Sequence, residues 1–192
     1  MLDQKFFDKL KKDYASYNTG RKITIGKSND ILRYSKQAIF ALHRGELDNA
    51  DAILKEAEKL MTYLTDDIIA KDAHLEYEGA FGAAMEEYAE ARLFYNFLKD
   101  KKIGAIKEAA LSINAYLGGL SDLCGEIVRY AVKMATKREQ QEVEVCRDAV
   151  ESVIGEMIQM DIIGSFRTKY DQAKNALRKI EEILYDIEIR KK

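Results

Sequence analysis

Apolar residues recur three and four positions apart along most of the chain, which is the spacing of one face of an α-helix. This pattern predicts helices over residues 3–16, 23–43, 48–63, 83–99, 106–136, 139–160 and 166–188, and a further one from the LTDD segment to about residue 78. The segment YNTG (17–20) is expected to break the first two apart, and Asp48 is a candidate N-cap. Strand-like alternation is confined to ITI at 23–25. We therefore expect an all-α fold, a single domain over residues 1–192 built as a bundle of about seven helices.

The composition supports this expectation and excludes other classes. Proline is absent, so the Pro-Gly turns of an all-β protein are missing, and 192 residues suffice for one substantial core. Cys124 and Cys146 form no CxxC pair, and Cys124 is expected to be a reduced core thiol. The chain start has no signal-peptide core, and the charge-free run at 109–121 is too short for a bilayer. We expect no membrane partner and a cytoplasmic location.

The net charge of −2 hides an uneven distribution along the chain. Residues 1–44 hold ten Lys/Arg and four Asp/Glu, whereas residues 45–99 hold five Lys/Arg and thirteen Asp/Glu. The first part is suited to a polyanion and the second to cations. Solvated helix faces without any partner would give the same imbalance.

The acidic segment EEYAEA (86–91) places Glu86, Glu87 and Glu90 at helical spacings of three and four. Like charges at these spacings repel by a few tenths of a kcal/mol. No Lys or Arg lies three or four residues from any of the three glutamates. The cluster therefore calls for a cation from elsewhere, which is either a basic side chain or a metal ion.

The segment YLGGLSDLCGEIVRYAV (116–132) has one helical face of apolar residues, which is expected to pack in the core, and a second face of glycines and charged residues. That second face carries Gly118, Asp122, Gly125, Glu126 and Arg129. In one interpretation Glu126 pairs with Arg129, and Asp122 bonds a neighbouring helix. In the other, the two carboxylates converge with those of EEYAEA to form an oxygen-ligand site for Mg²⁺ or Mn²⁺. Such a site typically activates water against a phosphodiester.

Other catalytic motifs are missing from the sequence. No Glu-x-x-His occurs, which disfavours a ferritin-like di-iron bundle. The chain also lacks GxxxxGK[ST], GxGxxG and GxSxG. His43 is expected at the end of a helix, where capping is its ordinary role.

Three segments, in order along the chain, resemble the translin superfamily. Residues 116–132 resemble its Leu-x-Gly-x-x-Asp-Leu-x-Gly-Glu-Leu-x-Arg signature, residues 21–44 its N-terminal segment, and residues 179–190 its C-terminal helix. EEYAEA resembles the acidic segment of translin-associated factor X, except that Glu86 stands where glutamine is usual. Because the polar extensions of the eukaryotic factor are missing, the chain resembles a compact prokaryotic or archaeal member.

The resemblance implies a translin-like α-α superhelix and a Mg²⁺-dependent endoribonuclease that cuts single-stranded RNA. The implied metal-binding and catalytic residues are Glu87, Glu90, Asp122 and Glu126. It also implies a homo-oligomer, an octamer in this family, and single-stranded DNA is a second expected ligand. The candidate contacts to the nucleic-acid backbone are Arg129, Arg21, Lys22, Arg33, Lys36 and Arg44.

Two other functions fit the same sequence. One is a translin-like protein that binds single-stranded RNA or DNA without cutting it, and the other is a helical scaffold for protein partners. Cleavage with Mg²⁺ and its absence with EDTA would exclude the first, and RNA affinity in a salt titration would exclude the second.

Overall fold

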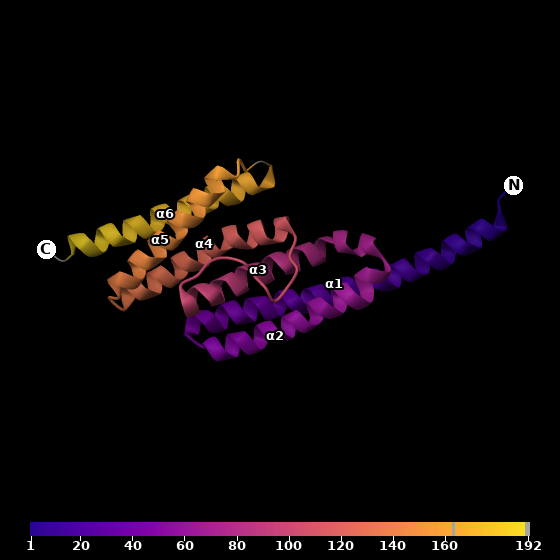
Figure 1. Ribbon diagram of the computed structural model, residues 1–192, viewed down its shortest axis with the longest axis horizontal. Helices are drawn as coiled ribbons and strands as arrows, with labels where there is room; N and C mark the ends of the chain where they lie inside the picture. Colours follow the sequence, from indigo (N-terminus) through magenta and orange to yellow (C-terminus); the bar gives the residue numbers. More distant parts are fainter. Residues whose placement is uncertain (163, 191–192) are drawn as a thin grey trace.

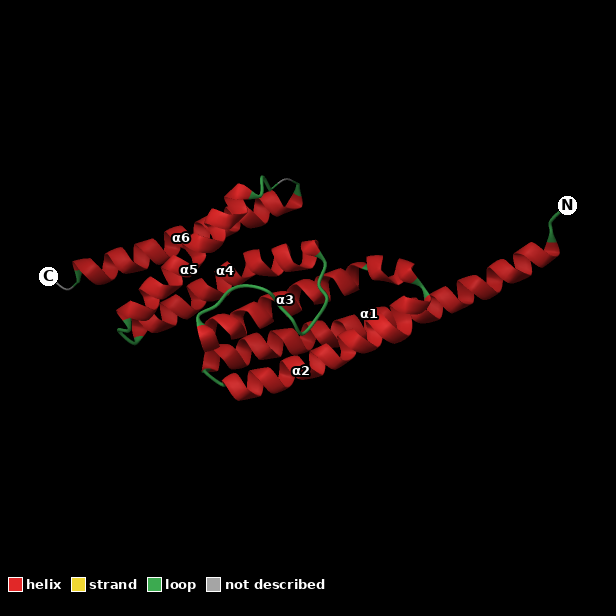
Figure 2. Cartoon of the chain, viewed as in Figure 1, coloured by secondary structure: helices red, strands yellow, loops and turns green. Residues whose placement is uncertain are grey.

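The computed structural model describes residues 1–162 and 164–190, and within these ranges it contains helices and no strand (Figures 1 and 2). Six α-helices form the bundle: α1 (Gln4–Arg44), α2 (Leu47–Tyr63), α3 (Gly79–Asp100), α4 (Ile113–Thr136), α5 (Gln140–Gln159) and α6 (Ser165–Ile189). The all-α expectation is confirmed, with six helices in place of about seven. No helix in the described ranges is long and apolar enough to cross a membrane.

Helix α1 continues through residues 17–20, so the expected break at YNTG is wrong. Thr19 Oγ1 donates a 3.0 Å hydrogen bond to the Ala15 carbonyl, which keeps this polar side chain inside the helical pattern. Gly20 serves packing, because a Cβ at this position would lie 2.8 Å from Leu75 Cδ1. The N-terminal end of α1 projects beyond the other helices (Figure 1).

The segment after α2 is not the α-helix expected up to residue 78. It consists of one π-helical turn (Leu64–Ile68) and two 3₁₀ turns (Ile69–Lys71 and Ala73–Tyr77). Asp72 interrupts the helical path with an extended backbone, and its side chain accepts a 3.1 Å hydrogen bond from the His74 amide. Asp48 is also not an N-cap, since it lies in the first turn of α2, after the N-cap residue Glu46.

Helix α4 begins at residue 113 rather than at about 106. Ser112 is its N-cap and accepts a 3.2 Å hydrogen bond from the Ala115 amide. Helices α3 and α4 run in the same direction, so the connection over residues 101–112 has to return along the bundle before α4 can start (Figure 1). Tyr116 fastens this connection with a 2.8 Å hydrogen bond to the Gly104 carbonyl.

The core lies between α3 and its neighbours and is filled by large side chains such as Tyr88, Phe94 and Leu123, all fully buried. Helices α3 and α4 approach closely at Gly119, where a Cβ would lie 2.6 Å from the Glu90 backbone nitrogen and 2.7 Å from the Glu86 carbonyl oxygen. This close packing brings the acidic segment of α3 against the signature segment of α4.

Candidate functional site

Two parallel helices present the predicted carboxylates to one another. Glu87 and Glu90 lie on α3, and Asp122 and Glu126 lie one turn apart on α4. Glu90 is buried, whereas the other three are partly exposed. The site therefore opens to solvent at one side and is closed by the core at Glu90.

The four carboxylates act on one another electrostatically, which places them in one cluster. Burial is the largest cause that raises the pKa of Glu90, and together with the charges of Glu87, Asp122 and Glu126 it brings that pKa to about 8. Burial likewise raises the pKa of Glu87; Lys36 opposes the rise, while Asp122 and Glu126 add to it. Within the described part of the chain, no group donates a hydrogen bond to the side-chain carboxyl group of Glu90. Basic side chains therefore offset the repulsion among the four carboxylates only in part, and Glu90 favours its protonated, neutral form.

Lys169 from α6 reaches the edge of this cluster. Its ammonium donates a 2.6 Å hydrogen bond to Asp122 and a 2.7 Å hydrogen bond to Glu86. Burial opposes the charge on Lys169, but these two hydrogen bonds outweigh it and raise the pKa of the amine. Glu86, which departs from the glutamine usual in the resemblance, thus takes part in a bridge between α3, α4 and α6.

His43 at the end of α1 supplies a second contact. Its Nε2 donates a hydrogen bond to Glu126, and its ring lies 4.9 Å from the Phe94 ring, centroid to centroid. Arg129 also contacts Glu126, at 3.5 Å. Burial would raise the pKa of Glu126, but His43 and Arg129 outweigh it and lower the pKa. The expected Glu126–Arg129 pair is present, and the neighbouring-helix partner of Asp122 is Lys169.

The donor types suit a hard divalent cation, because Mg²⁺ and Mn²⁺ prefer carboxylate oxygens. Among the residues that the structure describes, however, no three Asp, Glu, His or Cys side chains are arranged to hold a metal ion. Two of the four carboxylates accept hydrogen bonds from basic side chains, Asp122 from Lys169 and Glu126 from His43, and Glu87 lies 3.9 Å from Lys36. A metal ion would therefore compete with Lys169 and His43 for these two carboxylates.

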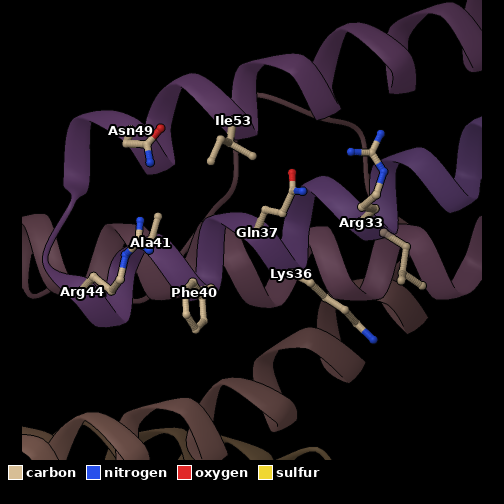
Figure 3. Close-up of a pocket in the computed structure, with 9 residues that line it drawn as sticks. Arg33, Lys36, Gln37, Phe40, Ala41, Arg44, Asn49 and Ile53 are labelled. Carbon is tan, nitrogen blue, oxygen red and sulfur yellow. The ribbon is translucent and has the colours of Figure 1, made fainter.

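A groove of about 530 Å³ lies between α1 and α2 and gathers three of the predicted nucleic-acid contacts (Figure 3). Arg33, Lys36 and Arg44 line it, together with Leu32, Gln37, Phe40, Ala41, Asn49 and Ile53. Lys36 connects this groove to the carboxylate cluster, since its Nζ lies 3.9 Å from Glu87 Oε2. The basic groove and the acidic cluster are therefore neighbours on the surface.

Other predicted contacts lie elsewhere. Arg21 forms a 2.8 Å ion pair with Glu78, and it lies fifteen positions before Lys36, which is about 22 Å along the helix. Exposed Lys22 shares that remote position. Arg129 lies at the carboxylate cluster rather than in the groove.

Sequence reasoning missed two side chains of the site, His43 and Lys169. His43 was expected to cap a helix, but Gly45, with φ of 84°, ends α1 and leaves the imidazole free for Glu126. Its position seven residues after Lys36, on nearly the same helix face, was the available signal. Lys169 had no such signal, because its role depends on how α6 packs against α4.

The fold and the site define an all-α bundle that presents a carboxylate cluster beside a basic groove. The chain matches the Translin family over residues 21–191 and belongs to that family. No curated protein sequence matches it.

Solved structures share this fold at low sequence identity. The chain is similar to apo-NeC3PO, with a TM-score of 0.88 and 22% identity over 97% of this chain and 98% of that chain. It is also similar to AfC3PO, with a TM-score of 0.87 and 18% identity over 96% of this chain and 97% of that chain. The AfC3PO–duplex RNA complex matches with a TM-score of 0.86 and 17% identity over the same shares of both chains.

Proposed function

We propose that this Translin family protein is a metal-dependent endoribonuclease, of the kind resembling translin-associated factor X, that cuts single-stranded RNA. The observation that carries the proposal is the cluster of Glu87, Glu90, Asp122 and Glu126, four carboxyl groups that act on one another beside a basic groove. The AfC3PO complex contains duplex RNA, which supports RNA as the class of ligand. Single-stranded DNA is a second candidate ligand.

With Lys169 displaced from Asp122 and His43 from Glu126, the four carboxylates would converge to hold Mg²⁺ or Mn²⁺. When bound, a divalent cation lowers the pKa of water and offsets negative charge on a scissile phosphate. Hydrolysis then adds water across one P–O bond, so that oxygen from water bonds to phosphorus and the leaving oxygen takes up a proton. The chain's own residues would orient the substrate: Lys36 and Arg44, which line the groove, would bind backbone phosphates, and Arg129, which contacts Glu126, would bind the phosphate nearest the cluster.

The family resemblance and the exposed apolar face of α1 support a homo-oligomer, with an octamer as the expected form. Phe6, Leu10 and Tyr14 are exposed on the projecting end of α1 at successive helical turns. Such a stripe is suited to burial against a second copy of the chain.

Cleavage of a labelled single-stranded RNA tests the proposal. Wild type should cut with Mg²⁺ and spare the RNA with EDTA, and Glu126→Ala should lose at least about 100-fold in rate, since its carboxylate is part of the proposed metal site. Glu151→Gln is the control, because Glu151 is an exposed glutamate on α5. Circular dichroism and size exclusion establish that each variant keeps its fold and assembly. RNA that is bound but left intact by wild type under both conditions would identify a non-catalytic binding protein.

A further inference from the structure

The groove between α1 and α2 carries an exposed aromatic ring among its cations. Phe40 is 55% exposed, although phenylalanine side chains are usually buried. The guanidinium of Arg44 lies 5.1 Å from the centroid of the Phe40 ring. In Figure 3, Phe40 and Lys36 extend from α1 to the same side. A flat apolar surface thus lies between two positive charges.

The charges around this ring suit a polyanion. The groove lining contains Arg33, Lys36 and Arg44 and no carboxylate. Arg33 pairs with Asp30 and Arg44 with Glu46, but all four side chains are exposed, so these ion pairs can be exchanged for phosphate at little cost. Lys36 is likewise exposed and lies 3.9 Å from Glu87.

We propose that this groove is a stacking subsite for an unpaired nucleotide base, with Phe40 as the stacking surface and Lys36 and Arg44 holding the flanking phosphates. The inference rests on the proposed function and assigns a residue that selects single strands. Every base presents a π-face, whereas the bases of a duplex are already stacked and paired. A ring that requires a free base therefore favours single-stranded nucleic acid over duplex.

The position of Phe40 along α1 connects this subsite to the carboxylates. Lys36, one turn before Phe40, contacts Glu87, and His43, one turn after it, binds Glu126. A strand with one base on Phe40 therefore passes directly beside the cluster. The subsite would fix which phosphate of the strand faces Asp122 and Glu126.

The test measures binding in EDTA, so that no cutting occurs, with a single-stranded RNA in which one adenine is replaced by 2-aminopurine. Stacking on the ring should quench the fluorescence of 2-aminopurine when wild type binds. Phe40→Leu should bind about 5- to 100-fold more weakly and quench less, which is the range for removal of one stacking aromatic side chain. Phe40→Trp should restore both the RNA affinity and the quenching of 2-aminopurine. Tyr63→Leu is the control, since Tyr63 is exposed on α2 about 15 Å along the helix from Ile53.

Two further ligands distinguish stacking from charge alone. Wild type should bind the single strand more tightly than an abasic chain of equal length and more tightly than the duplex, and Phe40→Leu should lose most of this preference. Equal binding by wild type and Phe40→Leu would overturn the subsite while leaving the proposed function intact. A change in oligomeric state with Phe40→Leu would also overturn it, by placing the ring in a protein interface. If wild type binds no RNA at all, the proposed function itself fails.

Discussion

The ammonium of Lys169 lies 2.6 Å from the carboxylate of Asp122 and 2.7 Å from that of Glu86. One lysine from α6 thus forms ion pairs with acids from both α3 and α4. The sequence predicted that either a basic side chain or a metal ion would lie beside these acids, and in the structure Lys169 is such a basic side chain. The remaining acids, Glu87 and Glu90, have no comparable partner among the described residues.

Removing this ammonium should strengthen divalent-cation binding. With Lys169→Met, the competing charge is gone, and we expect Mn²⁺ to bind about tenfold more tightly, equivalent to about 1.4 kcal/mol. Titration calorimetry measures the affinity, and thermal unfolding with and without Mn²⁺ gives an independent readout. Lys174→Met, an exposed lysine on the same helix, is the control. Equal Mn²⁺ affinity in wild type and Lys169→Met would contradict competition at this site.

The three glycines of the α4 signature should respond differently to alanine. Gly119→Ala should destabilise the protein by about 1–3 kcal/mol, because the new Cβ meets α3 backbone atoms at 2.6 to 2.7 Å. Gly118→Ala should cost less, since its Cβ meets the movable end of the Glu86 side chain. Gly125→Ala should stabilise by up to about 1 kcal/mol, because nothing lies within 4 Å. Urea unfolding gives the order, and a destabilised Gly125→Ala would contradict the packing described for α4.

Stability in EDTA should fall as pH rises toward 8. The pKa of Glu90 is raised from an ordinary value of 4.5 to about 8, so between these values the folded protein holds a proton that the unfolded chain has lost. The shifted pKa of Glu90 therefore adds to the free energy of unfolding in full below about pH 4.5. This added stability declines by at most about 1.4 kcal/mol per pH unit and is lost above about pH 8. Glu90→Gln should remove the decline, whereas Glu151→Gln should keep it. If the free energy of unfolding changed with pH in the same way for wild type and Glu90→Gln between pH 5 and 9, the pKa of Glu90 would not be raised in the folded protein.

A buried arginine should be essential to the joint between α2 and α3. Arg92 is 2% exposed and contacts Glu58 and Asp51 of α2. Arg92→Met should cost about 3–5 kcal/mol, because it leaves the partly buried Glu58 carboxylate without its positive partner and with only the Tyr88 hydroxyl as a donor. Arg92→Met combined with Glu58→Gln should recover part of this loss. Denaturant unfolding measures both variants, and a loss below 1 kcal/mol for Arg92→Met would mean that packing rather than charge holds this joint.

Helical periodicity predicted the all-α fold, and the spacing of acids within EEYAEA and the α4 signature placed two pairs of carboxylates on two faces. The apolar periodicity did not predict that α1 is continuous. Gly20 disfavours a helix when only the local sequence is considered, but in the folded protein it allows Leu75 to pack closely against α1. The partners of the acids were equally hidden. Lys169 lies 47 residues from Asp122 and His43 lies 83 residues from Glu126, so only tertiary packing brings them together.

Because α1 runs unbroken for 41 residues, it is a rod about 60 Å long that has the exposed residues Phe6, Leu10 and Tyr14 near one end and Lys36 and His43 near the other. A rod without a hinge tilts as one body. A neighbour that grips its projecting end would therefore shift Lys36 and His43 against α3 and α4. Assembly and the spacing of the carboxylate cluster would then be mechanically linked, with α1 acting as the lever between them.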